Sequence, residues 1–241
     1  MTFTGLAALG LLAAAGSGLA WLVVKGRQQQ RKADFERSVL SRKLGWSYDG
    51  TRDGRVDYRF WARAGELSWS MWYDSDRGDD SPTPKARWSS ENLRTPRLAL
   101  LILGRRRFGL ESGTFGRLFM GIVSGVATAI SARGGMPDRT EFYESAVPLE
   151  EGSPAFRERF AVALAPDMPR GWLDDGAQKL LMQWPAGRGG RTLKAEDAVE
   201  VSLGPGGLSI TVQKMPDDMA HWQHLARLGE HLAAQLAPSS R

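Results

Sequence analysis

The chain has 241 residues, of which 42% are hydrophobic, and its formal net charge at pH 7 is +5. It contains no cysteine, which excludes disulfides, thiolate nucleophiles, iron–sulfur clusters and zinc sites with cysteine ligands. The apolar content and the nine tryptophans exclude a disordered polar chain and are sufficient for one large domain or two small ones.

The first 24 residues carry no charged side chain, and four basic residues follow at Lys25, Arg27, Arg31 and Lys32. A helix over residues 3–24 would be about 33 Å long, close to the thickness of a bilayer core. This pattern predicts a transmembrane anchor at 1–24 and a cationic juxtamembrane segment at 25–33. The positive-inside rule places the N-terminus outside and the C-terminal domain in the cytoplasm, at the inner membrane of a bacterial source.

Two other interpretations of the anchor stay open. A cleaved signal peptide could end near Gly18, although no positive n-region precedes it and the apolar run continues beyond it. A buried core helix would be less uniformly apolar than this segment. The small residues Gly10, Ala14 and Gly18 recur every four positions, and this spacing lets two helices pack closely in lipid. The predicted partners are therefore the membrane, spanned once, and a second copy of the chain through the transmembrane helix.

Basic residues are concentrated in two blocks, with a net charge of +4 over residues 25–50 and +6 over 84–120. Both blocks could contact the anionic headgroups of one membrane leaflet, while ordinary solvated surface charge is the plainer interpretation. A nucleic-acid partner is not expected. The candidate residues for an anionic ligand or lipid headgroup are Lys25, Arg27, Arg31, Lys32, Arg105, Arg106 and Arg107.

The next segments predict a short helix and a β-hairpin. Residues 34–44 have apolar side chains on one side of a helix, and Gly45 follows as a stop. Residues 56–64 and 67–74 alternate between apolar and polar side chains, as half-buried antiparallel strands do. Most of their aromatic residues are expected in the core, whereas Trp61 and Trp72 fall on the polar face and could stack against bases or sugars.

A polar segment over residues 74–96 is predicted to be a long loop. Its four aspartates, Asp74, Asp76, Asp79 and Asp80, do not match an EF-hand, because the sixth and twelfth positions are Asp79 and Lys85. A loose cation site remains an alternative to a hydrated loop. We predict no cofactor and no metal.

The apolar residues 97–104 predict a central strand. Residues 117–133 form a second apolar segment that is short for a membrane span. A buried core helix, an interfacial or re-entrant helix and a second span are all open interpretations. The second span would place the C-terminal half on the other side of the membrane.

The second half of the chain predicts strands and helices in alternation. A boundary between halves is expected within 133–156. A strand at 159–165, a helix before Pro185, a hairpin around the Gly204–Gly207 turn and a helix over 217–237 follow. The predicted fold class is α+β: one N-terminal transmembrane helix and then a soluble domain, 34–241, of antiparallel strands and hairpins with packed helices and a long C-terminal helix.

Sequence motifs for known chemistries are missing. The chain has no P-loop, no nucleophile elbow and no metalloprotease motif, and the glycine-rich stretch 187–192 does not complete a dinucleotide-binding pattern. All three histidines, His221, His224 and His231, lie on one side of the last predicted helix. A metal or acid–base role for them is an alternative to a structural one, and no third ligand is identifiable.

These observations predict a membrane-anchored interaction or scaffold module that faces the cytoplasm, has a protein partner and has no catalytic residues. One alternative is a peripheral domain that senses anionic lipid or a phosphate ligand. The other is an enzyme whose site follows no known motif.

Overall fold

The structure is a computed structural model, and it describes residues 24–25, 28–51, 56–75, 84–106, 142, 145–149, 151–187, 190 and 192–237. The chain divides into two compact units, residues 1–48 and residues 49–241. The predicted boundaries at 1–24, 25–33 and 34–241, and the boundary within 133–156, stay predictions.

The N-terminal unit contains a helix over residues 28–43, which confirms the helix predicted in this region. It ends where Gly45 adopts a φ of +73°, a left-handed conformation that glycine accepts without strain. Asp34 organises one side of the helix, because its carboxylate pairs with Arg37 at 3.0 Å and accepts a hydrogen bond from the Tyr48 hydroxyl at 2.7 Å. Burial of the Tyr48 hydroxyl, together with its bond to Asp34, raises the pKa of this phenol.

The described helices contradict the predicted membrane anchor. None of the helices in the described ranges combines the length and the apolar character that crossing a membrane requires. The predicted fold class, the integral-membrane partner and the single-pass membrane localisation are therefore wrong as far as they rest on such a helix. The described N-terminal helix is too polar for lipid because charged residues occur along its length: Arg31, Lys32, Asp34, Glu36, Arg37, Arg42 and Lys43.

Several sequence predictions fall outside the described residues. They include nearly all of the predicted anchor, with Gly10, Ala14 and Gly18 of the dimer face, and the whole apolar segment 117–133. The antiparallel strands and packed helices agree with the α+β part of the predicted fold class.

Within the described residues, nine strands form one antiparallel sheet in the order β1-β2-β3-β4-β9-β8-β5-β7-β6. The strands are β1 (Ser47–Asp49), β2 (Val56–Ala64), β3 (Leu67–Asp74), β4 (Lys85–Ser90), β5 (Leu100–Gly104), β6 (Val147–Pro148), β7 (Phe160–Leu164), β8 (Val199–Gly204) and β9 (Gly207–Gln213). The hairpins β2–β3 and β8–β9 and the strands β5 and β7 confirm the sequence predictions.

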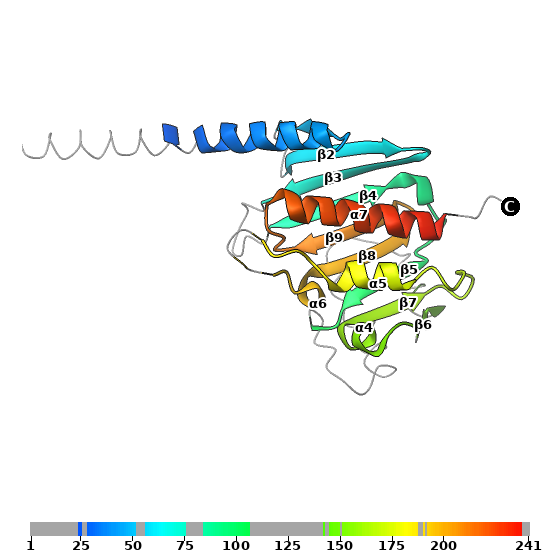
Figure 1. Ribbon diagram of the computed structural model, residues 1–241. Helices are drawn as coiled ribbons and strands as arrows, with labels where there is room; N and C mark the ends of the chain where they lie inside the picture. Colours follow the sequence, from blue (N-terminus) through cyan, green and yellow to red (C-terminus); the bar gives the residue numbers. More distant parts are fainter. Residues whose placement is uncertain are drawn as a thin grey trace, which may run out of the picture. The chain divides into compact units, whose positions relative to one another are not determined.

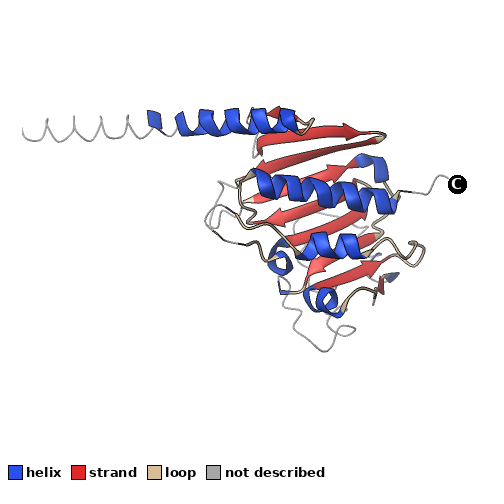
Figure 2. Ribbon diagram, in the orientation of Figure 1, coloured by secondary structure: helices blue, strands red, loops and turns tan. Residues whose placement is uncertain are grey.

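Helices cover one face of this sheet (Figures 1 and 2). They are α4 (Pro154–Arg159), α5 (Asp175–Met182), α6 (Ala195–Ala198) and α7 (Met219–Leu236), with a 3-10 turn η1 (Glu91–Leu93) after β4. Aspartates cap the two longer helices, as Asp174 accepts from the Ala177 N–H and Asp218 from the His221 N–H. Helix α7 confirms the predicted C-terminal helix and lies across β4 and β9, while α5 lies beside it.

Aromatic side chains fix α7 to the sheet. The Trp222 ring packs against Tyr58, Phe60 and Tyr73 at centroid distances of 5.7, 5.3 and 6.1 Å. Two turns further along, Gly229 lies directly over Trp88, and a Cβ at this position would approach Cε2 of the indole to 2.3 Å. Glycine is therefore required where α7 crosses β4. We call this side of the sheet the helix-covered face.

The loop predicted over 74–96 is wrong for residues 85–90, which form strand β4. The strand pairs with β3 on one side and with β9 on the other. It therefore connects the β2–β3 hairpin to the rest of the sheet.

Candidate functional site

The face of the sheet opposite the helices is polar over strands β2, β3, β4, β9 and β8, and we call it the polar face. Strand alternation directs Tyr58, Phe60, Met71 and Trp88 to the helix-covered face, where all are at most 3% exposed. Their neighbours in sequence face the other way. The members of the polar face are Arg59, Trp61, Ser70, Trp72, Lys85, Arg87, Ser89, Glu200, Ser202, Ser209, Thr211 and Gln213.

The register of the strands places five of these residues in one row across the sheet. Arg59 is paired with Trp72, Trp72 with Arg87, Arg87 with Thr211, and Thr211 with Glu200. Directly paired residues on one face have Cβ atoms about 5 Å apart, so neighbouring side chains are within reach of each other. The indole of Trp72 therefore lies between two arginines from adjacent strands.

A second row runs parallel to the first and begins at Trp61. Trp61 is paired with Ser70, and the row continues through Ser89, Ser209 and Ser202. The Ser70 and Ser89 hydroxyls are 3.2 Å apart, and the Arg87 Nε–H donates to the Ser209 hydroxyl at 2.7 Å. The serines are short, so the side chains of Trp61, Trp72 and Arg59 project beyond them.

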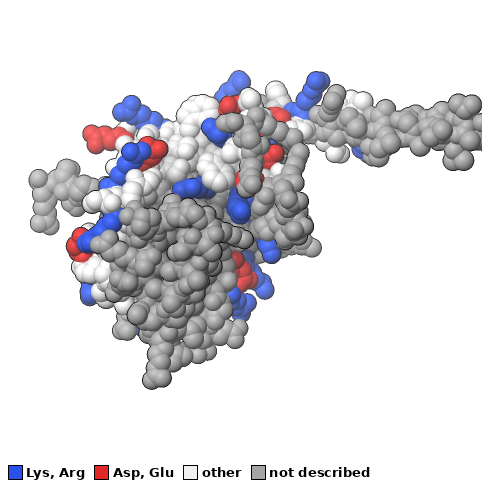
Figure 3. Space-filling view, turned by 180° about the vertical axis from the view of Figure 1, so that it is seen from behind, with Lys and Arg blue, Asp and Glu red and all other residues white. Residues whose placement is uncertain are grey.

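The polar face is accessible on strands β2 and β3. Trp61 is 44% exposed, Arg59 is exposed and Trp72 is half-buried. Figure 3 shows the molecule from behind, with blue Lys and Arg side chains and red Asp and Glu side chains interspersed among white residues on the part that described residues form. The basic side chains Arg59, Arg63, Lys85 and Arg87 exceed the acidic ones, Asp57, Asp74 and Glu200, on these strands. Asp74 is only 8% exposed, so the accessible charge is mainly positive.

Trp61 and Trp72 lie on the polar face as the alternation predicted, whereas Arg87 was missed. The sequence signal for Arg87 was present, because Lys85, Arg87 and Ser89 alternate with the buried Ala86, Trp88 and Ser90. Of the aspartates that the loop interpretation grouped together, Asp74 ends β3, and Asp76, Asp79 and Asp80 lie outside the described residues.

The three histidines hold α7 in place. The His224 Nε2–H donates to the Leu180 carbonyl at 2.8 Å, and the His231 Nε2–H donates to the Asp174 carboxylate at 2.8 Å. The His221 Nδ1–H donates to Asp218, and its buried Nε2 has no hydrogen-bond partner among the described residues. These bonds link α7 to α5 and to its own N-terminus, which gives each ring a structural role.

The pKa values at this helix contact follow from these bonds. Burial is the main cause that lowers the pKa of His224, and it outweighs the bond to Leu180. The hydrogen bond from His231 lowers the pKa of Asp174. Among the described residues, no group of three or more His, Asp or Glu side chains could hold a metal ion.

The predicted basic residues lie in different parts of the chain. Arg105 follows β5, where its Nε–H donates to the Phe160 carbonyl at 3.2 Å and burial lowers its pKa. It lines an open cavity of about 350 Å³ together with Arg157 and Glu158 of α4. Arg106 follows it, and Arg107 and Arg27 are outside the described residues. Lys25, Arg31 and Lys32 belong to the N-terminal unit. Their role in binding an anionic ligand stays a prediction.

Comparisons with known proteins leave the geometry as the only guide to function. No protein-family model, curated protein or solved structure matches this chain.

Proposed function

We propose that this chain is an interaction module and that its polar face binds an acidic segment of a partner protein. The observation that supports the proposal most directly is the row in which Trp72 lies between Arg59 and Arg87. Tryptophan and arginine are the residues that most often dominate the binding energy of protein interfaces. A partner of opposite charge would complement the excess of basic side chains on strands β2–β4.

The chemistry of the row suits carboxylates in particular. Guanidinium groups bind carboxylates with two parallel hydrogen bonds, and such charge-assisted bonds are stronger than neutral ones. Arg59 and Arg87 are separated by two strand spacings, or about 10 Å, with an indole between them that can pack against apolar parts of the partner. The second row adds serine hydroxyls, which donate and accept hydrogen bonds.

The test uses the full chain, with an oligoglutamate peptide as the probe and an uncharged serine–glycine peptide of equal length as its control. The side-chain N–H signals of Trp61 and Trp72 in an NMR titration should shift with oligoglutamate, and those of the buried Trp88 and Trp222 should not. The shifts should disappear at about 0.5 M salt, because the charges are near the surface and salt screens them.

Matched variants locate the binding energy. Arg59→Gln should weaken oligoglutamate binding about tenfold, since a hydrogen bond to a charged group contributes roughly 1.5–3 kcal/mol. Arg227 is an exposed residue of α7 and does not lie on the polar face. Arg227→Gln therefore removes the same charge elsewhere and should leave oligoglutamate binding unchanged. Tighter binding of an oligodeoxythymidine at the same tryptophans would instead assign the face to single-stranded nucleic acid, and no shift with either probe would reject the proposal.

A further inference from the structure

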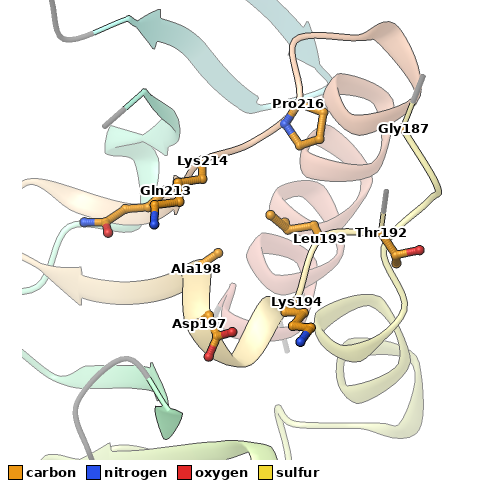
Figure 4. Close-up of a pocket in the computed structure, with 9 residues that line it drawn as sticks. All are labelled: Gly187, Thr192, Leu193, Lys194, Asp197, Ala198, Gln213, Lys214 and Pro216. Carbon is orange, nitrogen blue, oxygen red and sulfur yellow. The ribbon is translucent and has the colours of Figure 1, made fainter. Parts of the chain in front are cut away.

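A cavity of about 510 Å³ lies where strand β9 ends and the chain turns toward α7. Figure 4 shows its lining, which comes from three segments: Gly187, Thr192, Leu193 and Lys194 before α6, Asp197 and Ala198 of α6, and Gln213, Lys214 and Pro216 after β9. Cavities that bind small molecules have volumes of about 300–1,000 Å³ and mainly apolar walls with a few polar groups. This cavity lies within that range of size, and its lining is more polar, since five of its nine residues carry polar or charged side chains.

Described residues on both sides of the cavity form backbone hydrogen bonds. Ala186 and Thr192 form an isolated antiparallel bridge, and the Gly190 N–H donates to the Gly187 carbonyl at 2.9 Å. On the other side, Lys214 has a φ of +54° and its N–H donates to the Pro84 carbonyl at 2.7 Å. A left-handed conformation is uncommon for a residue other than glycine, and such residues occur preferentially at functional sites.

The lining combines an apolar centre with a basic rim. Leu193, Ala198 and Pro216 surround the middle of the cavity in Figure 4. Lys194 and Lys214 line its rim and are exposed. The lining contains one carboxylate, that of Asp197, so the basic side chains outnumber the acidic ones. Within the described part of the chain, neither lysine side chain has an ion-pair or hydrogen-bond partner.

We propose that this cavity is a binding site for a small organic anion: a carboxylate or phosphate group on a compact apolar body. The apolar body packs against Leu193, Ala198 and Pro216, and Lys194 and Lys214 bind the anionic group. A lysine ammonium is a mobile point charge that accommodates either kind of anion. The site does not depend on the polar face, so either proposal can fail without the other.

The choice of variants follows from the packing behind the cavity. A Cβ on Gly187 would lie 3.2 Å from Oδ2 of Asp218 and 3.3 Å from Cε1 of His221, so substitution there would disturb the N-terminus of α7. Leu193 is half-buried and is directed into the cavity (Figure 4). Leu193→Trp therefore fills the cavity with little disturbance of the fold, and an unchanged thermal midpoint would verify this.

The experiment titrates the full chain with phenyl phosphate and with octanoate, and follows the methyl NMR signals of Thr192, Leu193 and Ala198. Benzyl alcohol and octanol are the uncharged controls. At least one anion should shift these signals with a Kd below about 1 mM, and the alcohols should bind at least tenfold more weakly. Whether phenyl phosphate or octanoate binds more tightly identifies the anionic group, and inorganic phosphate alone should bind more weakly than either.

Two substitutions decide the outcome. Lys214→Gln should weaken binding of the preferred anion about tenfold, and Leu193→Trp should abolish it. Lys179→Gln, which removes a charge from an exposed position on α5, should have no effect. Equal binding of an anion and its matching alcohol, shifts that do not saturate, or full binding to Lys214→Gln would each overturn the proposal.

Discussion

The two faces of the sheet use the same kinds of residue for different purposes. Strand β3 directs Trp69 to the helix-covered face, where it is 3% exposed and donates a hydrogen bond to Glu230 of α7 at 2.9 Å. Three residues later it directs Trp72 to the polar face, between two arginines. Strands β4 and β2 repeat the contrast, since Trp88 is fully buried and Trp61 is 44% exposed.

The difference shows that aromatic content alone does not identify a core. A buried indole stabilises the fold because its whole surface leaves water, whereas an exposed one contributes little until a partner covers it. Substitutions on the helix-covered face should therefore change stability, and matching substitutions on the polar face should change binding.

The largest effect is expected for Trp88→Ala. The side chain is fully buried between β4 and α7, so its removal loses the transfer free energy and leaves a cavity. We expect the free energy of unfolding to fall by about 3–5 kcal/mol, measured by urea denaturation. A loss below about 1 kcal/mol would mean that α7 does not depend on this residue.

Gly229→Ala should have the next largest effect. The new Cβ would be 2.3 Å from Cε2 and 2.4 Å from Cδ2 of Trp88, so α7 must move away from the sheet. We expect a loss of about 1–3 kcal/mol from overpacking, which exceeds the helix-propensity gain of about 1 kcal/mol for alanine over glycine.

A double-mutant cycle checks the cause of this loss. In a Trp88→Leu background the smaller side chain leaves room for the methyl group, so Gly229→Ala should cost less or should stabilise. An equal cost in both backgrounds would show that contact with Trp88 is not the reason.

The contact between α5 and α7 should depend on pH. Burial lowers the pKa of His224 below its usual value of about 6.5, so the unfolded chain binds more protons than the folded one just below that pH. His224 therefore stabilises the fold fully above its unfolded pKa, and stability falls as the pH drops from about 7 toward the lower folded value.

His224→Gln tests this dependence. Glutamine can donate to the Leu180 carbonyl but does not titrate, so the slope of unfolding free energy between pH 7 and 5 should become flatter. His231→Gln is the control, because it leaves His224 in place. This variant should keep the contribution of His224 to the pH dependence of the unfolding free energy. A slope that is the same in His224→Gln and in the unsubstituted protein would show that His224 does not cause it.

Strong periodicity made parts of this comparison predictable from sequence. The alternation in β2, β3, β8 and β9 identified strands and assigned Trp61, Trp72 and Trp69 to their correct faces, because a period of two needs only local information. The apolar stripe of α7 was equally local. The position of Gly229 over Trp88 was not predictable, since these residues are 141 positions apart and only the packed helix brings them together.

Two other features required knowledge of the tertiary structure. Strand β4 was interpreted as part of a loop because prolines and aspartates precede it, and its burial comes from β3, β9 and α7 rather than from its own composition. The cavity beside Lys214 is built from segments that are separate in sequence, so no sequence pattern joined its lining residues, and the glycine-rich stretch 187–192 did not identify it. The membrane anchor was predicted from composition alone, and no described helix supports it.

The smallest effect on stability, and the most informative one, is expected for Trp61→Ala. Trp61 is 44% exposed and is paired with a serine on the neighbouring strand, so its loss should change the free energy of unfolding by no more than about 0.5 kcal/mol. Oligoglutamate binding should weaken in the same variant, whereas Trp61→Phe should retain most of it because an aromatic plane remains. Destabilisation by about 2 kcal/mol or more would place Trp61 in the core, and the polar face would then be a structural surface rather than a binding one. Unchanged stability together with weakened binding would separate the functions of the two faces within a single strand, because Phe60, the residue before Trp61, is fully buried.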